Sequence, residues 1–294
     1  MGSGDIETGA GLIDGKAAAL TVRREVQARL ALLAEHGVVP GLAILLVGAH
    51  APSEIYVKKK LDLCKRVGIR ATLHRFPADV SEATLFATIA TLNADPSVHG
   101  ILCQLPLPLH LNSKATIDRI DPEKDVDGLH PLNIGRLQTG RPGFIPCTPL
   151  GVMRLLTDHE VVIKGRHAVV LGRSAIVGRP MSWLLLRAHA TVTTCHRHTP
   201  NTAELAATAD ILVSAVGLPG LVRRDWVKPG AVVIDVGINR LPDGSIVGDV
   251  AFDEVRQVAS LITPVPGGVG PMTVAMLLAN VALAAERSVS LRGR

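Results

Sequence analysis

Short apolar runs bounded by glycine alternate with segments of helical spacing along the first half of the chain. Residues 41–47 form a continuous apolar run, which is typical of a strand buried on both faces of a parallel sheet. The pattern further predicts a helix from near Ser53 to Gly68, a strand over 69–76, a helix over 81–92 and a strand over 98–103. This βαβαβ order predicts a parallel-sheet domain.

The second half repeats the alternation. Thr148 and Pro149 suit an N-cap followed by proline at the first helical position, so a linking helix is expected from about residue 149. The elements predicted after it are strands over 168–171, 190–195, 211–215 and 231–236, with helices over 176–188 and 202–208. Residues 261–273 are rich in glycine and proline, and the apolar helix predicted over 274–286 is expected to pack back on the first domain.

Residues 167–180 change from strand to helix periodicity in mid-course. Gly172 permits a sharp turn, Ser174 can cap the helix or contact an anion, and Gly178 lets the helix approach the strand. A helix N-terminus placed after a strand presents free backbone N–H groups to a phosphate. Taken alone, the G-x-S-x-x-x-G pattern fits an ordinary strand-to-helix turn about equally well.

These elements predict an α/β protein with two α/β domains, the second a Rossmann-like nucleotide-binding domain, and a substrate cleft between them. The expected boundaries are 5–148 plus 274–294 for the first domain and 149–273 for the second. Met1–Gly4 are expected to be disordered and are left out of the fold prediction.

Composition narrows the function classes. The 294 residues carry a formal charge of +5, but only 2% are aromatic, which disfavours nucleic acid as a partner and favours an anionic small molecule. Four scattered cysteines without a C-x-x-C pair predict reduced thiols and no metal site. No apolar run long enough for a membrane span is recognised, and a cytoplasmic protein is expected.

Ser53, Tyr56 and Lys60 share one face of the predicted helix, with Tyr56 and Lys60 four residues apart. A lysine beside an aromatic hydroxyl can move protons or polarise a reacting nitrogen. From spacing alone, a solvated helix face is the favoured interpretation of Lys58–Lys60.

Gln104 and Asp127 fall at strand and loop ends, where an amide and a carboxylate can read the donors and acceptors of a heterocycle. Taken alone, each residue is more readily explained as a loop glutamine or a turn-capping aspartate. His130, His196 and His198 lack metal spacing and are interpreted as surface or phosphate-contact residues. Ser174 has no G-x-S-x-G elbow, which argues against a hydrolase triad.

Six motifs together resemble the bifunctional methylenetetrahydrofolate dehydrogenase/cyclohydrolase family. They are Ser53-Glu-Ile-Tyr-Val-Lys-Lys-Lys60, Gln104-Leu-Pro-Leu-Pro108, Lys124-Asp-Val-Asp-Gly128, Pro146-Cys-Thr-Pro149, Gly172-Arg-Ser-Ala-Ile-Val-Gly-Arg-Pro180 and Pro264-Val-Pro-Gly-Gly-Val-Gly-Pro-Met-Thr273. The resemblance covers nearly the whole chain from Ile13.

The resemblance implies NADP-dependent oxidation of 5,10-methylenetetrahydrofolate to the 5,10-methenyl cation and hydrolysis of that cation to 10-formyltetrahydrofolate. It also implies a homodimer, tetrahydrofolate derivatives as ligands, and a place in one-carbon metabolism and purine biosynthesis. The family's catalytic lysine matches Lys60, its stacking tyrosine Tyr56, its glutamine Gln104 and its pteridine-binding aspartate Asp127. One departure is Cys103, where many relatives have valine.

Cofactor choice has a second argument. An acidic residue about 20 positions after the glycine turn binds the ribose 2′-hydroxyl of NAD, whereas arginine there accommodates a 2′-phosphate. Residues 195–199 read Cys-His-Arg-His-Thr, without an acid. Arg173 and Arg197 are therefore expected to face the 2′-phosphate, which favours NADP over NAD.

The expected substrate-binding residues are Ser53, Tyr56, Lys60, Cys103, Gln104, Leu105, Asp127, Pro266, Gly267, Gly268, Val269 and Gly270, the last five closing over folate. The expected cofactor-binding residues are Gly172, Arg173, Ser174, Val177, Gly178, Arg197 and, at the nicotinamide end, Ile238. Two other functions remain open: another NADP-dependent α/β dehydrogenase, of the shikimate type, and a folate-binding relative without catalysis.

Overall fold

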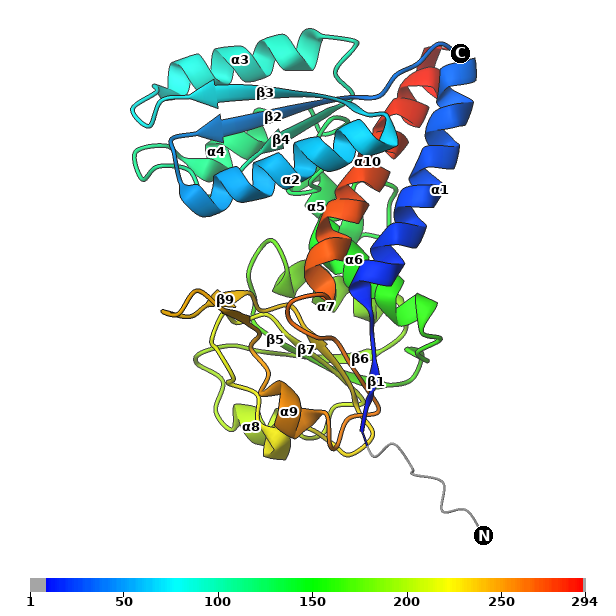
Figure 1. The fold of residues 1–294 in the computed structure, drawn as a ribbon, viewed down its shortest axis with the longest axis vertical. Helices are drawn as coiled ribbons and strands as arrows, with labels where there is room; N and C mark the ends of the chain where they lie inside the picture. Colours follow the sequence, from blue (N-terminus) through cyan, green and yellow to red (C-terminus); the bar gives the residue numbers. More distant parts are fainter. Residues whose placement is uncertain (1–8, 293–294) are drawn as a thin grey trace. The chain divides into compact units, whose positions relative to one another are not determined.

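The computed structural model describes residues 9–292, with side chains described to residue 289. The expectation for Met1–Gly4 lies outside these residues. The chain divides into two compact units (Figure 1). The three-stranded unit comprises Leu20–Cys147 and the chain from Val274 on, and the six-stranded unit comprises Thr148–Thr273 and the chain up to Ala19.

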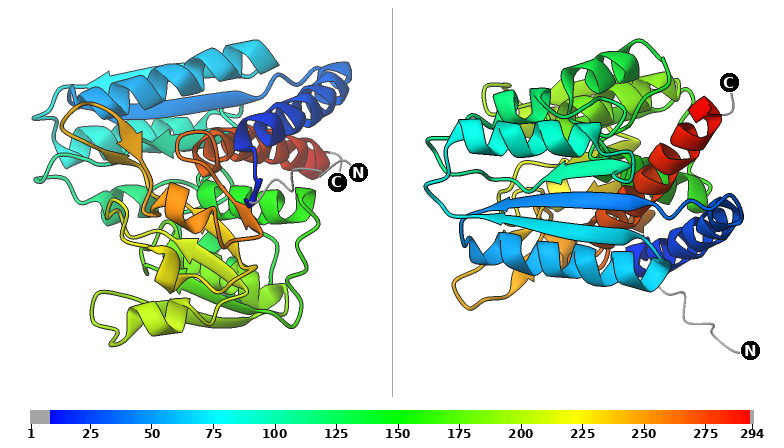
Figure 2. Two further views of the ribbon diagram at one scale, coloured as in Figure 1. Left: turned by 60° about the horizontal axis from the view of Figure 1, so that its bottom comes forward. Right: turned by 90° about the horizontal axis from the view of Figure 1, so that it is seen from above.

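The three-stranded unit holds a parallel sheet in the order β3-β2-β4. Its elements are most of α1 (Gly15–Glu35), β2 (Gly41–Val47), α2 (Ala51–Val67), β3 (Arg70–Phe76), α3 (Glu82–Ala94), β4 (Gly100–Cys103), α4 (Ser113–Asp118), α5 (Pro131–Gln138) and most of α10 (Val269–Arg292). Figures 1 and 2 show α2 and α3 on opposite faces of this sheet. Two-sided cover explains why every residue of β2 is buried.

Local sequence explains the ends of α2. Pro52 occupies the first turn, and the helix begins two residues before the expected Ser53. The helix ends as predicted at Gly68, whose φ of 97° is left-handed and whose N–H donates to the carbonyl of Cys64. The predicted strands and the predicted helix over 81–92 are also present, with Ser81 as the N-cap of α3.

The final helix begins five residues earlier than expected, at Val269, so its first turn lies inside the glycine- and proline-rich segment. Asn280 is buried on it and donates to the carbonyls of Val126 and Ile145, which places this part of α10 in the core of the three-stranded unit. Arg29 of α1 pairs with Glu286 at 2.7 Å.

The helix α10 also comes closer to a membrane span than the sequence analysis recognised. Val269–Val289 is long and apolar enough to cross a membrane, with a mean hydropathy of 1.5. Because 67% of its most apolar stretch is buried inside the protein, the segment has the character of a core helix.

The six-stranded unit holds a wholly parallel sheet in the order β1-β11-β8-β7-β5-β6. Its elements are β1 (Gly11–Leu12), most of α6 (Cys147–Asp158), β5 (His167–Leu171), α7 (Gly178–Arg187), β6 (Thr191–Cys195), α8 (Thr202–Ala206), β7 (Ile211–Ser214), a 3₁₀ turn (Arg224–Trp226), β8 (Val232–Asp235), the hairpin strands β9 (Asn239–Arg240) and β10 (Ile246–Val247), α9 (Phe252–Val255) and β11 (Leu261–Ile262). The sheet is the parallel α/β architecture that was predicted.

The N-terminal segment differs from the expected boundary, which began the first domain at residue 5. Gly11 and Leu12 pair in parallel with Leu261 and Ile262 and so extend the six-stranded sheet. Two-residue strands carry no hydrophobic period, and for that reason neither β1 nor β11 is visible in the sequence.

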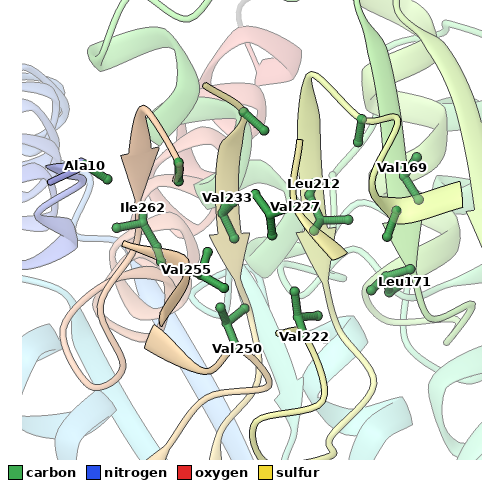
Figure 3. Close-up of a cluster of buried hydrophobic side chains, with 14 of the residues drawn as sticks. Ala10, Val169, Leu171, Leu212, Val222, Val227, Val233, Val250, Val255 and Ile262 are labelled. Atoms are coloured by element: carbon green, nitrogen blue, oxygen red, sulfur yellow. The ribbon is translucent and has the colours of Figure 1, made fainter. Parts of the chain in front are cut away.

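Figure 3 shows part of the core of this unit, with side chains such as Val169, Leu212, Val233 and Ile262 contributed by successive strands. All four are completely buried. This packing fixes the strand register, and the register fixes which loop ends lie side by side at the carboxyl edge of the sheet.

Candidate functional site

Lys60 and Gln104 meet in the three-stranded unit. Lys60 Nζ, on α2, donates a 2.9 Å hydrogen bond to Gln104 Oε1, on the residue directly after β4. Both side chains are half-buried. The structure thus brings together two residues, 44 positions apart in sequence, that were predicted to share a site.

Two further bonds fix the glutamine. Its backbone N–H donates to the carbonyl of Leu45 on β2 at 2.9 Å, and its Nε2 donates to the carbonyl of Leu105 at 2.8 Å. The amide oxygen therefore points at the lysine. Leu105, predicted to contact substrate, is partly buried against the core beside α3, and the peptide bond from Leu105 to Pro106 is cis.

Asp127 and Lys60 both act electrostatically on one buried thiol, that of Cys147. Burial raises the pKa of the Cys103 thiol to about 12, and the charge of Asp127 adds to that rise. Burial also raises the pKa of Cys147 well above its usual range, with Asp127 raising it further and Lys60 acting in the opposite direction. Cys103, expected to bind substrate, is 6% exposed. Burial thus disfavours the thiolate form of both side chains.

A second carboxyl group, that of Asp125, is buried two residues before Asp127 in the chain. Asp125 is 2% exposed and accepts hydrogen bonds from the N–H groups of Leu129 and His130 and from Asn133 Nδ2. Burial raises its pKa to about 6 despite these bonds, and the charge of Asp127 contributes to the rise. His130, interpreted from sequence as a surface or phosphate-contact residue, caps α5 by accepting from Leu132 N–H.

The remaining residues of the predicted α2 face differ in exposure. Tyr56, four residues before Lys60, is 38% exposed and can offer an aromatic face to a ligand. Ser53 is 3% exposed, and its hydroxyl lies 2.9 Å from His50 Nδ1. The serine thus supports the start of α2, and its role in substrate binding stays a prediction.

The glycine turn of the six-stranded unit has the geometry expected from its sequence. Gly172 has a φ of 106°, and a Cβ there would lie 2.3 Å from the carbonyl oxygen of Ala215. A Cβ on Gly178 would lie 2.1 Å from the carbonyl oxygen of Gly172. Ser174 Oγ accepts from the N–H groups of Val177 and Gly178 at 3.1 and 3.3 Å. The turn is a close-fitting backbone cradle at the start of α7.

Arg173 and Arg197 follow neighbouring strands of this sheet. Leu171 pairs with Cys195, so residues two positions beyond each strand end leave the same edge. Both arginines are exposed, and neither takes part in an ion pair among the described side chains. Arg197 Nε donates to His198 Nε2 at 3.0 Å. Two uncompensated guanidinium groups at one edge suit a doubly charged phosphate.

Ile238 and the segment Pro266–Gly270 also belong to the six-stranded unit. Ile238 is 49% exposed, and a Cβ on Gly270 would lie 3.7 Å from its Cδ1 atom. Gly267 has a φ of 117° beside the side chain of Lys16. The expected closure of this segment over folate stays a prediction.

Sequence reasoning missed the buried carboxyl groups that support these loops. They are Asp125 in the three-stranded unit, and Asp235 and Asp249 in the six-stranded unit. In the sequence, Asp125 and Asp249 lie in turn-like segments rich in Asp and Gly and are indistinguishable from surface turn residues, whereas Asp235 lies in the apolar run predicted as a strand over 231–236. Among the described residues, no group of three or more His, Cys, Asp or Glu side chains could hold a metal ion.

Two family models match the chain. The catalytic domain of tetrahydrofolate dehydrogenase/cyclohydrolase matches residues 13–127, and the NAD(P)-binding domain of the same family matches residues 146–289. Together they cover both units, and the second match contains the glycine turn and both arginines.

Individual relatives agree along nearly the whole chain. The bifunctional protein FolD of Polaromonas naphthalenivorans is 52% identical over 94% of this chain and 98% of its own length. The bifunctional protein FolD of Geobacillus thermodenitrificans is 53% identical over 94% and 97%.

Two solved structures have the same fold. The bifunctional FolD methylenetetrahydrofolate dehydrogenase/cyclohydrolase of Campylobacter jejuni superposes with a TM-score of 0.94 at 47% identity, covering 95% of this chain and 99% of its own. The Trypanosoma brucei enzyme, solved with NADP cofactor and an inhibitor, gives 0.91 at 42% identity, covering 96% and 99%.

Proposed function

Because this chain belongs to the tetrahydrofolate dehydrogenase/cyclohydrolase family, we propose that its two reactions share one set of side chains, Lys60, Gln104, Asp127 and Tyr56. The protein is an NADP-dependent methylenetetrahydrofolate dehydrogenase and methenyltetrahydrofolate cyclohydrolase. The roles of the individual residues, the oligomeric state and the cellular compartment belong to the proposal.

In the cyclohydrolase reaction, water adds to the methenyl carbon and the bond from that carbon to N5 of the folate breaks. One proton of the water ends on N5, and the other is released as 10-formyltetrahydrofolate forms. We assign the transfer of these protons to Lys60, because its amine is the proton-transferring group among the four side chains. Its Nζ is held in place by a 2.9 Å hydrogen bond to Gln104 Oε1. Gln104 keeps the amine at one position while its own amide is fixed by Leu105.

Asp127 and Tyr56 hold the folate in this proposal. The half-buried carboxylate of Asp127 accepts from the amino and ring N–H groups of the pterin, in charge-assisted hydrogen bonds. The exposed ring of Tyr56 stacks on the pterin or on its cationic methenyl form. Hydrophobic cover from the ring also limits the access of bulk water to the reacting carbon.

The six-stranded unit offers NADP a glycine turn at a helix start and two arginine side chains. The turn at Gly172 and Gly178 packs so closely on the protein's own backbone that neither position has room for a Cβ, and Ser174 orders the start of α7. Arg173 and Arg197 would hold the 2′-phosphate, and Ile238 the nicotinamide end. NADP, when bound, supplies the hydride acceptor for the dehydrogenase step.

The observation that carries this proposal is the hydrogen bond from Lys60 to Gln104, and Asp127 acts on the same buried thiol, that of Cys147, as Lys60 does. The test is purified protein with methylenetetrahydrofolate and NADP, followed for NADPH and for the methenyl and 10-formyl products. We expect NADPH to appear together with 10-formyltetrahydrofolate. Formation of neither product, with folate still bound, would identify a binding protein without catalysis.

A parallel assay addresses the other dehydrogenase reading. Shikimate and NADP give a reduced cofactor only if the enzyme is of the shikimate type, for which the pairing of Tyr56, Lys60 and Gln104 has no use. We expect no NADPH in that assay. Its appearance would overturn the folate assignment.

We further infer a homodimer that works in the cytoplasm and supplies 10-formyltetrahydrofolate to purine biosynthesis. All four cysteines are free and buried, which suits a reducing compartment. The family resemblance supports the dimer. Light scattering during gel filtration tests the dimer: a mass near 31.0 kDa, that of one chain, would contradict it.

A further inference from the structure

Asp249, a residue to which the sequence analysis gave no role, is completely buried in the six-stranded unit and accepts five hydrogen bonds. Its Oδ2 accepts from Ser214 Oγ at 3.2 Å, from Val216 N–H at 2.8 Å and from Gly217 N–H at 3.2 Å. Its Oδ1 accepts from Leu218 N–H and Asn239 Nδ2, each at 3.0 Å. Both oxygens of the carboxyl group act as acceptors in these five hydrogen bonds.

The donors come from the ends of two neighbouring strands. Three consecutive backbone N–H groups belong to the loop 216–218 after β7, and the side-chain donor Asn239 follows β8. Because Ser214 pairs with Asp235 in a parallel register, both loops leave the carboxyl edge of the sheet. Open α/β sheets bind their ligands at that edge.

The loop after β7 also borders the glycine turn. The carbonyl of Ala215 lies so close to Gly172 that a Cβ there would approach it to 2.3 Å. On the outer side, Leu218 is 54% exposed and Ile238 is 49% exposed. Two exposed apolar side chains at the ends of adjacent strands suit the flat, weakly polar ring of a nicotinamide.

Glycines allow the carboxylate to sit this close to the backbone. A Cβ on Gly237 would lie 2.2 Å from Asp249 Oδ1. A Cβ on Gly248 would lie 1.8 Å from Oδ2 of Asp235, whose carboxyl group accepts from the N–H groups of Gly237, Asp249 and Val250. Two buried carboxyl groups therefore lock the loops after β7 and β8 to each other.

We propose that Asp249 is a positioning residue for the dehydrogenase reaction: through the backbone of 216–218 and Asn239, it fixes the surface that orients the nicotinamide half of NADP. This inference rests on the proposed function, because a hydride transfer is needed for such orientation to matter. The adenosine half and the 2′-phosphate are assigned to the glycine turn and the arginines, which donate none of the five hydrogen bonds to Asp249, so we expect their binding to change little. We expect the cyclohydrolase reaction to change little as well.

Asp249→Asn tests this division of labour. Asparagine has nearly the same shape but one acceptor oxygen in place of two, so part of the backbone set loses its acceptor. We expect the dehydrogenase kcat to fall about 10- to 100-fold, as for a misplaced reactant. We also expect a larger primary deuterium isotope effect on kcat, and weaker NADP binding by calorimetry. The affinity for adenosine 2′,5′-bisphosphate and the cyclohydrolase rate should stay within about twofold of the wild-type values. A tenfold change would correspond to ~1.4 kcal/mol.

Asp210→Asn is the matched control. Asp210 undergoes the same change of charge at the opposite end of β7, where it pairs with Lys228 at 2.6 Å, and its replacement should leave every one of these quantities unchanged. Should Asp249→Asn fail to fold, Asn239→Ala is the second variant. It removes one of the five donors and leaves the other four hydrogen bonds to the Asp249 carboxyl group in place. It should lower kcat severalfold with the same rise in isotope effect.

Different results separate the inference from the function on which it rests. A wild-type protein without dehydrogenase activity would contradict the proposed function. A fully active wild type whose Asp249→Asn variant keeps kcat and the isotope effect would contradict the positioning role alone. If Asp249→Asn lowers bisphosphate affinity and the cyclohydrolase rate as much as it lowers the dehydrogenase kcat, and lowers the melting temperature as well, the role of Asp249 is purely structural. That result would also overturn the inference.

Discussion

The sites that we propose in the two units lie at the carboxyl edge of a parallel sheet and differ in the groups that form them. In the three-stranded unit, the residues of the proposed site are side chains: Lys60 and Gln104 are hydrogen-bonded, and Asp127 acts on the same buried thiol, that of Cys147, as Lys60 does. In the six-stranded unit, the backbone provides most of it, through the close-packed turn at Gly172 and Gly178. A common feature is a buried aspartate behind the exposed loops, Asp125 in one unit and Asp249 in the other.

This difference determines how each unit responds to mutation. A side chain such as that of Lys60 can be replaced without changing the backbone, so chemistry is lost while the fold remains. A glycine whose Cβ position is occupied cannot be replaced without moving a neighbouring strand end. Substitutions of the proposed site residues in the three-stranded unit should therefore alter rates or folate affinity while the fold remains, and substitutions in the glycine turn should alter cofactor affinity together with local stability.

The largest effect is expected for Lys60→Met. Loss of the proton-handling group should lower the cyclohydrolase rate by about 10²- to 10⁴-fold and leave the NADP dissociation constant unchanged. The measurement is the decay of the methenyl compound, with NADP titrated by calorimetry on the same preparation. Lys58→Met, an exposed lysine on the same helix, is the control. Near-normal hydrolysis by Lys60→Met would remove the residue from the mechanism.

Gly172→Ala tests the backbone side of the comparison. The new Cβ combines an unfavourable φ of 106° with a 2.3 Å approach to a carbonyl oxygen, which should weaken NADP binding by roughly 2–4 kcal/mol. Cyclohydrolase activity should persist. Gly165→Ala is the control, because Gly165 has a φ of 76° but no atom within 4 Å of the added Cβ. Equal NADP affinities in the two variants would show that the turn is not a close cradle.

Replacing Arg173 and Arg197 together with serine tests the side-chain part of cofactor selection. A 2′-phosphate carries nearly two charges at neutral pH, and losing both cations should raise the KM for NADP by up to about 100-fold while changing that for NAD little. The difference should shrink at high salt, since both side chains are exposed. An unaltered NADP-to-NAD ratio of specificity constants would mean that the phosphate is held elsewhere.

Asp127→Asn should weaken folate binding by about 1–3 kcal/mol, because a charge-assisted hydrogen bond to the pterin becomes a neutral one. The measurement is the dissociation constant of tetrahydrofolate, with NADP affinity as the internal control. Asp121→Asn, in the same acidic turn but outside the proposed set, should have no effect on either. Unchanged folate affinity in Asp127→Asn would leave Asp127 as a turn residue only.

The smallest expected effect concerns Asp125 and pH. Burial raises its pKa from 3.8 to about 6, so between these values the folded protein binds more protons at this site than the unfolded chain. Its contribution to stability is therefore present in full below pH ~4 and is lost as pH rises through ~6. Asp125→Asn, neutral at every pH, should lack this dependence. The free energy of unfolding of the wild type minus that of the variant should be larger at pH 4 than at pH 7.5, by about 1–2 kcal/mol.

Asp235 has a pKa raised to about 6 as well, mainly by burial, and titrates in the same range. Because both proteins contain Asp235, its contribution cancels in the difference between wild type and Asp125→Asn. Denaturant titrations at the two pH values give the required free energies. A difference that is equal at both pH values, or larger at pH 7.5, would contradict the raised pKa of Asp125.

The sequence by itself determined the local part of the fold. Continuous apolar runs marked β2 and β5, Gly68 marked the end of α2, and the spacing of Gly172, Ser174 and Gly178 predicted the strand-to-helix turn. These features depend on neighbours within a few residues, where hydrophobic period and backbone freedom are decisive. The motif around Tyr56 and Lys60 could be placed on a helix face for the same reason.

Only the tertiary structure decided which distant residues meet. The hydrogen bond from Lys60 to Gln104 joins a helix to the end of a strand. The pairing of Gly11 with Leu261 joins β1, near the start of the chain, to β11, which is far from it in sequence. Asp249 carries no local signal, since its five donors are gathered from the ends of two other strands. Such contacts depend on sheet order and register, which burial of the whole core selects and no short segment of sequence encodes.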